Sequence, residues 1–328
     1  MRSLKWSFWI SRSVVAASVF LVPHLVGASP RMVSVAYNSS LQNPQQVGSE
    51  AFREKLLALS GKRIIVDFRV GNALGSEGTV LSGVRSGAVD VAVVSGGVVS
   101  AVVPAMGVFD IPFLFSDEKQ ARTVMSGPVA AKVAAKFLDQ GLVLLALGRQ
   151  GFRELTNSRH PIRTPADLKG LKIRVIPNET YMMAFKALGA DVVPMDFPLV
   201  YAALKDGRLD GQENPPATIA SNHFNEVQKY ITLTDHFFAP IVFVANRAMF
   251  EQLDPADQEA LIEAAKAGAD ATWNTQLDVA KLKYLHEAGM DITDKINRQA
   301  FVDAVKPLDP EFEKRFGKDL IAAIRSTR

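Results

Sequence analysis

The chain of 328 residues has a formal net charge of +3, is 48% hydrophobic and contains no cysteine. Its length allows one large or two medium-sized domains with their own cores. The absence of cysteine from the sequence excludes disulfides, thiolate catalysis and cysteine-ligated metals.

The first 28 residues have the three-part pattern of a secretory signal peptide. Basic residues at Arg2, Lys5 and Arg12 precede an apolar run over 14–26, and small residues follow it. The alternative is an uncleaved membrane anchor, but the run of about 13 residues is shorter than the roughly 20 that a transmembrane helix needs. We therefore expect residues 1–28 to be removed on export and the mature chain to be soluble in the periplasm.

The signal peptide also accounts for the excess of positive charge. It holds three basic and no acidic residues, so the mature chain keeps 34 basic and 34 acidic side chains. A balanced charge argues against binding to nucleic acid or to a membrane surface, because both need clustered basic residues. We expect no nucleic-acid partner and a monomer.

Short apolar strands alternate with helices through the mature chain. The expected strands span 31–37, 63–70, 89–95, 142–148, 171–177 and 190–195. The expected helices span 44–61, 76–87, 128–139, 178–189 and 197–207. This alternation predicts an α/β fold with largely parallel sheets, in which ligands bind beyond the carboxyl ends of the strands.

The segment 255–289 has a different pattern, because it contains no internal proline and ends in glycine. It predicts a single helix of about 35 residues, which would be roughly 50 Å long. A helix of that length is suited to bracing two lobes.

Recognisable catalytic and metal-binding motifs are absent from the sequence. The four histidines of the mature chain, His160, His223, His236 and His286, do not have metal-ligand spacing. There is no G-x-S-x-G nucleophile motif, and the glycine-rich stretch 71–78 matches no phosphate-binding loop. We therefore expect no metal, no cofactor and no enzymatic activity.

Two arginines lie at the ends of expected strands. Arg153 follows a strand, and Arg174 lies inside the apolar strand LKIRVIP, just before the helix that begins near Asn178. An arginine in such a strand usually reaches solvent or pairs with a carboxylate of the protein. Alternatively, its planar fork binds a ligand carboxylate, which the nearby helix N-terminus would also favour.

Several spaced blocks of the sequence resemble one protein family. They are GFR (151–153), DLKGLKIRV (167–175), DGQENP (210–215) and VQKY (227–230), preceded by GSEGTVLSGVRSGAVDVAVVS (75–95) and VFDIPFLFSDEKQAR (108–122). Together they are similar to the extracytoplasmic solute-binding proteins of TRAP transporters, the DctP-type family. The resemblance covers about residues 31–255.

The resemblance implies a two-lobed α/β periplasmic binding protein with a central sheet in each lobe, hinge strands and a long helix that spans both lobes. We expect the first lobe to comprise residues 29–150 and about 240–279, and the second to comprise 151–239 and about 280–328. It also implies a function. Such proteins capture a small organic acid and deliver it to the membrane permease subunits of the transporter.

Two other classes of function stay open at this point. The chain resembles a ligand receptor, so it can equally serve a signalling system in place of a transporter. A periplasmic enzyme on an α/β scaffold is the second, less favoured, alternative.

The resemblance also implies which residues bind the ligand. Arg174 matches the arginine that clamps the ligand carboxylate, Arg153 a second basic contact, and Asn214 an amide that orients the carboxylate or the arginine. Phe197 matches an apolar wall. The remaining predicted site residues are Ser95 and Asn38 from the other lobe and His236 at a strand end, where an ordinary structural histidine is an equal alternative.

Neighbouring residues are expected to have supporting roles. DGQENP is interpreted as a strand-to-helix loop of the site, in which Gln212 and Glu213 support the fold or Arg174. Glu77 is expected to cap its helix, and Ile176 before Pro177 departs from the family pattern.

Overall fold

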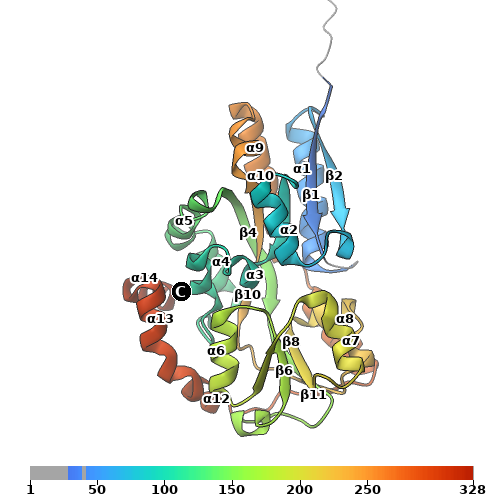
Figure 1. Ribbon diagram of the computed structural model, residues 1–328, viewed down its shortest axis with the longest axis vertical. Helices are drawn as coiled ribbons and strands as arrows, with labels where there is room; N and C mark the ends of the chain where they lie inside the picture. The colour runs from blue at the N-terminus through green and yellow to red at the C-terminus, as the bar shows by residue number, and fades with distance from the viewer. Residues whose placement is uncertain (1–28, 39–41, 328) are drawn as a thin grey trace, which may run out of the picture.

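The computed structural model describes residues 29–38 and 42–327. The predicted signal peptide, residues 1–28, lies outside the described residues. The described chain forms two lobes, each built on its own sheet, and strands β4 and β10 run from one lobe toward the other (Figure 1). The predicted two-lobed α/β fold with a sheet in each lobe is therefore confirmed.

The sheet of the first lobe has five strands in the order β2-β1-β3-β10-β4. Strands β1 and β2, and β1 and β3, pair in parallel, whereas β10 runs antiparallel to both β3 and β4. The bounds are β1 Arg31–Tyr37, β2 Ile64–Val70, β3 Val91–Ser95, β4 Leu142–Phe152 and β10 Phe238–Asn246.

The sheet of the second lobe has six strands in the order β11-β9-β5-β8-β6-β7. Strand β5 runs antiparallel to β8 and β9, and the other pairs are parallel. The bounds are β5 Glu154–Asn157, β6 Lys172–Val175, β7 Asp191–Pro194, β8 Gly211–Asn214, β9 Tyr230–Thr232 and β11 Asp291–Thr293.

Most strand pairs are parallel, as expected, but one strand in each sheet, β10 or β5, runs antiparallel to its neighbours, because the chain crosses between the lobes in two places. Strand β4 of the first lobe leads directly into β5 of the second, and β9 of the second lobe returns through a short connection to β10 of the first. Each crossing therefore contributes one strand to each sheet, and in each sheet these two strands run antiparallel to each other. The amide of Arg153 donates to the carbonyl of Phe237 over 2.9 Å where the two crossings meet. These crossings lie where the hinge strands were expected.

Helices cover both faces of each sheet, and those predicted from the sequence form in place with small differences at their ends. The bounds are α1 Pro44–Leu59, α2 Glu77–Ser86, α3 Gly96–Val99, α4 Glu118–Met125, α5 Pro128–Ala134, α6 Glu179–Ala187, α7 Val200–Lys205, α8 Pro216–Ser221, α9 Arg247–Glu251, α10 Pro255–Trp273, α11 Leu277–Glu287, α12 Arg298–Val305, α13 Asp309–Phe316 and α14 Lys318–Ser326. Within the described residues, none of these helices has both the length and the apolar character needed to cross a bilayer.

The single long helix expected over 255–289 is two helices, α10 and α11, separated at residues 274–276. Helix α10 packs against α1 and β4 in the first lobe, whereas α11 packs against α8 in the second. The helix is interrupted at Asn274 and Thr275, residue types that stabilise a helix poorly.

The C-terminal segment differs from the predicted division into lobes. Strand β11 and helix α12 belong to the second lobe, where they contact β9 and α6. Helices α13 and α14 return to the first lobe and bury Phe312, Ile321 and Ile324 in its core. Burial of these apolar side chains stabilises the two helices against the first lobe, where α14 packs beside α5.

Candidate functional site

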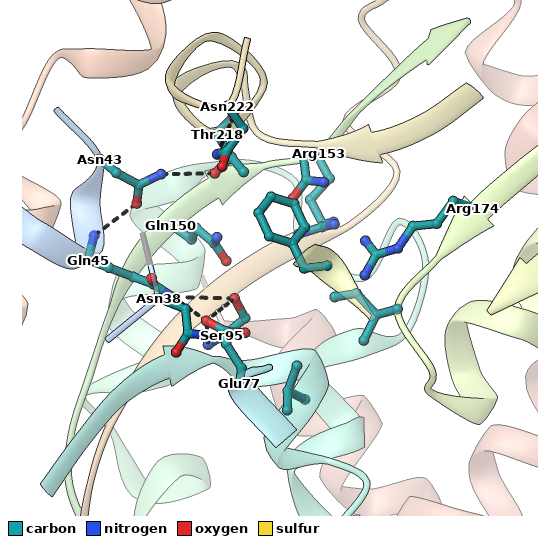
Figure 2. Close-up of a pocket in the computed structure, with 14 residues that line it drawn as sticks. Asn38, Asn43, Gln45, Glu77, Ser95, Gln150, Arg153, Arg174, Thr218 and Asn222 are labelled. Atoms are coloured by element: carbon teal, nitrogen blue, oxygen red, sulfur yellow. Dashed lines mark hydrogen bonds between the residues drawn. The ribbon is translucent and has the colours of Figure 1, made fainter. Parts of the chain in front are cut away.

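A cavity opens between the two lobes. About 450 Å³ of space not filled by protein atoms lies there, including the open mouth of the cavity. Residues from both sheets line it (Figure 2). Six of the seven predicted site residues are among them: Arg174, Arg153, Asn214, Phe197, Ser95 and Asn38.

The strand order explains why residues distant in sequence meet here. Ser95 ends β3 and Asn38 follows β1, and these strands are parallel neighbours in the first lobe. Arg174 on β6 and Asn214 at the end of β8 lie on parallel neighbours in the second lobe. The carboxyl ends of both sheets thus face the same cavity, which is where α/β sheets bind ligands.

Arg153 is buried and fully engaged by Glu213. Its Nη2 donates to the Glu213 carboxylate over 2.8 Å and to the Glu213 carbonyl over 2.7 Å, and its Nε donates to the other carboxylate oxygen. Burial acts to raise the pKa of Glu213, but the charge and hydrogen bonds of Arg153 outweigh it, so that pKa is lowered. Glu213 was expected to support the fold or Arg174; it forms its ion pair with Arg153, and its charge also helps to hold up the pKa of Arg174.

Arg174 has a different environment, although it is only 2% exposed. Its Nε donates to the carbonyl of Met195 over 2.8 Å, and its guanidinium carbon lies 5.6 Å from the ring centre of Phe197. Among the described residues no carboxylate forms an ion pair with it. Burial without such a partner lowers the pKa of Arg174 to about 10, which still leaves it charged at neutral pH.

The first lobe contributes an acidic side chain to the cavity. Oε1 of Glu77 accepts hydrogen bonds from Nε2 of Gln45 over 2.6 Å and from the amide and hydroxyl of Ser95, each over 3.2 Å. Burial raises the pKa of Glu77, and these hydrogen bonds oppose that effect. The expectation that Glu77 caps its helix is wrong, because Ser76 is the capping residue of α2.

Two amide side chains of the cavity have an oxygen without a partner. Nδ2 of Asn38 donates to the carbonyl of Gly75 over 2.6 Å, but its Oδ1 is buried and accepts no hydrogen bond from the described residues. The same is true of Oε1 of Gln150. Buried polar atoms are normally paired, so these oxygens mark places where a ligand or water donates a hydrogen bond.

The DGQENP block is a central strand rather than the expected loop. Its residues 211–214 form β8 between β5 and β6, and Pro216 then begins α8. The side-chain amide of Asn214 donates to Oε1 of Gln212 over 2.6 Å, and Gln212 donates to Thr156 over 2.9 Å. Gln212 thus orients Asn214 toward the cavity, in line with its expected supporting role.

The structure does not bring His236 to the cavity. Its ring lies behind Glu213, with Nε2 at 3.2 Å from the carboxylate, and Nδ1 is 2.6 Å from the hydroxyl of Thr234. Burial lowers the pKa of His236, although Glu213 opposes this. His236 therefore supports the Arg153–Glu213 pair.

Sequence reasoning missed several polar residues of the cavity. They are Asn43, Gln45, Gln150, Thr218 and Asn222. A signal existed for Gln150, since it interrupts an apolar strand just before the GFR block. Asn43 and Thr218 have no such signal, because they meet only when the lobes close: Nδ2 of Asn43 lies 3.3 Å from Oγ1 of Thr218 across the cleft.

Comparison with known proteins places this geometry in a wider group. The family model of bacterial extracellular solute-binding proteins, family 7 (DctP), matches residues 35–315. The 2,3-diketo-L-gulonate-binding periplasmic protein of Escherichia coli is 33% identical over 307 residues, which are 93% of this chain and 92% of that protein.

Solved structures are similar over the same length. A TRAP periplasmic solute-binding protein from Polaromonas sp. bound to D-erythronate has a TM-score of 0.88 and 32% identity, covering 91% of this chain and 99% of that one. The sugar-acid-binding protein of Advenella mimigardefordensis in complex with galactonate has a TM-score of 0.87 and 33% identity, covering 91% of this chain and 98% of that one.

Proposed function

The chain belongs to bacterial extracellular solute-binding protein family 7, and we propose that it captures a small organic acid in the periplasm for a TRAP-type secondary transporter. One observation carries this proposal: Arg174 is a buried cation in the interlobe cavity, and no carboxylate among the described residues forms an ion pair with it. A buried charge without a partner is costly, so the fold retains Arg174 for an anion that arrives from outside.

The arrangement around Arg174 suits a carboxylate. Its Nε is fixed by the carbonyl of Met195, and the ring of Phe197 lies against its guanidinium. These contacts hold the planar fork still while its outer nitrogens stay available for a bidentate pair. Asn214, oriented by Gln212, is proposed to donate or accept beside that pair.

The remaining predicted residues have proposed roles that follow from their places. Arg153, neutralised by Glu213, contributes mainly its remaining Nη1 donor rather than a net charge. Ser95 and Asn38 contact the ligand from the first lobe, so the ligand bridges both lobes and stabilises their closure.

Delivery to a membrane permease follows from family membership. Relatives that bind erythronate and galactonate are described as TRAP solute-binding or sugar-acid-binding proteins. We therefore propose a hydroxylated carboxylic acid as the ligand class, permease subunits as the partner, and export directed by residues 1–28 as the route to the periplasm.

A thermal-shift screen of the mature protein tests this proposal. The panel contains erythronate, galactonate, pantoate, succinate, a uronate, an aromatic acid and neutral sugars, each well above its expected dissociation constant. Ligand that binds only the folded state raises the melting temperature by mass action. We expect shifts for hydroxylated carboxylates, absent in Arg174→Ala.

Arg208→Ala is the matched control, since Arg208 lies in the same lobe and its side chain is 61% exposed. It should keep the wild-type shifts. Shifts with neutral sugars alone, or shifts that persist in Arg174→Ala, would contradict the proposal.

A further inference from the structure

We infer that Glu77 is a specificity-determining residue: it selects acids that end in a hydroxyl group opposite Arg174 and rejects acids of the same length with a second carboxylate there. This inference rests on the proposed function, because it assumes that the ligand carboxylate binds Arg174. It concerns the other end of the ligand, which the carboxylate clamp leaves undefined.

The charges of the cavity support a ligand with a carboxylate at one end and a hydroxyl group at the other. Three of the 14 lining residues are charged: Arg153, Arg174 and Glu77. Arg153 is neutralised by Glu213, which leaves Arg174 on the second lobe and Glu77 on the first. In Figure 2 Glu77 and Ser95 lie on one side of the pocket, and Arg153 and Arg174 lie on the other.

Glu77 and Arg174 are close enough to influence each other but do not form an ion pair. Burial lowers the pKa of Arg174, and the charge of Glu77 is among the effects that oppose this. The described residues include no ion pair between them. A ligand placed between the two charges would meet a cation at one end and an anion at the other.

The hydrogen bonds around Glu77 favour its charged form. Three donors, from Gln45 and Ser95, converge on Oε1, and such an arrangement favours a carboxylate over a carboxylic acid. Oε2 has no partner among the residues that the structure describes and is the oxygen left to accept from a ligand. A hydroxyl group can donate to it, whereas a second carboxylate cannot.

Asn38 adds a second acceptor on the same wall. Its Nδ2 donates to the carbonyl of Gly75, which fixes the amide so that Oδ1 is the free atom. With Oε1 of Gln150, the first-lobe residues described around the cavity therefore offer three acceptors and no cation to the ligand. A ligand carboxylate placed there would face like charge and unpaired acceptors, and like-charge contacts of this kind are strongly unfavourable.

Calorimetric titration with matched pairs of ligands tests the inference. D-erythronate is compared with meso-tartrate, and galactonate with galactarate, because in each pair only the terminal hydroxymethyl group becomes a carboxylate. The proteins are the wild type, Glu77→Gln, Glu77→Met as a second neutral variant, and Glu259→Gln. Glu259 is an exposed residue of α10, so its variant matches the change in charge away from the cavity.

We expect the wild type to bind the better-fitting monoacid at least about a hundredfold more tightly than its diacid, as expected for a juxtaposition of like charges. Both Glu77 variants should reduce this ratio by about tenfold or more, and Glu259→Gln should keep it. Thermal unfolding of each variant shows that it is folded.

Three results would overturn the inference. The first is a wild type that binds a diacid as tightly as its matched monoacid, and the second is a ratio that persists in a folded, ligand-binding Glu77 variant; both leave the proposed function intact. If the wild type binds none of the acids, the proposed function fails and this inference fails with it.

Discussion

Two buried arginines, Arg153 and Arg174, line the same cavity in opposite electrostatic states. Arg153 is held by the Glu213 carboxylate, whereas Arg174 has only a backbone carbonyl and an aromatic ring. Both are at most 2% exposed, so both have lost the solvation that water gives a cation. The fold provides a counter-charge for Arg153, whereas Arg174 has no such ion pair among the described residues, which is why we propose it as the partner of the ligand carboxylate.

This difference separates a structural charge from a binding charge. Removing Arg153 takes the ion-pair partner from the buried Glu213 carboxylate, whereas among the described residues no carboxylate loses an ion pair when Arg174 is removed. The first change should damage folding, and the second should damage binding alone. The predictions below test this contrast.

The largest effect is expected for Arg153→Met. We expect the free energy of unfolding to fall by about 3–5 kcal/mol, because the buried Glu213 then lacks its counter-charge. The double variant Arg153→Met with Glu213→Met should recover most of this loss. Urea unfolding followed by circular dichroism measures both, and a single variant as stable as the double variant would contradict the structural role of the pair.

Arg174→Ala should weaken binding of the acid by about 2–5 kcal/mol, because it truncates one partner of a buried charge pair. Arg174→Lys should not restore affinity, since a lysine lacks the planar fork. The ligand-free variants should melt no lower than the wild type. A loss of stability as large as that of Arg153→Met would remove the contrast between the two arginines.

The same contrast holds for two buried carboxylates and predicts a pH dependence. Oδ1 of Asp110 has no partner among the described residues, and burial raises the pKa of this group from 3.8 to about 6, whereas the pKa of Glu213 is lowered by Arg153. Between pH 3.8 and about pH 6, Asp110 binds more protons in the folded state than in the unfolded state. The contribution of Asp110 to stability therefore falls as the pH rises through this window.

Urea unfolding of the wild type and Asp110→Asn from pH 4 to pH 7 measures this effect. The stability of the wild type relative to the variant should decrease by about 2–3 kcal/mol from the low to the high end of the window. A difference that stays constant with pH would show that Asp110 titrates near its ordinary value.

The smallest effect is expected for Phe197→Leu. This variant removes the ring beside the Arg174 guanidinium and keeps an apolar wall. The loss of an interaction between a cation and a ring should weaken binding by about 0.5–1 kcal/mol, or about twofold to fivefold. Calorimetry checks this, and an effect as large as that of Arg174→Ala would mean that Phe197 itself holds the ligand.

Much of the fold could be predicted from local pattern. The strands β1, β3 and β6 could be located in the sequence from their apolar residues, because a buried strand is typically a short, mainly apolar run. Three features could not be predicted in this way. The direction of β10 and the break between α10 and α11 depend on how two lobes are joined, and the return of α13 and α14 to the first lobe depends on which core has room.

The site was predictable where a charge interrupts an apolar strand. Arg174 in β6 is such a case, and the resemblance of its surroundings to a family added Arg153, Asn214 and Phe197. The role of Glu77 was not predictable. A helix-capping interpretation fits its position in sequence equally well, and only the folded first lobe brings it beside Gln45 and Ser95.

A crystal structure with the acid that gives the largest thermal shift tests the central claim most directly. The account predicts the ligand carboxylate in a bidentate pair with the outer nitrogens of Arg174, the Arg153–Glu213 pair unchanged, and hydroxyl groups at Glu77. A carboxylate bound elsewhere in the cleft, with Arg174 in contact with water or a carboxylate of the protein, would contradict it.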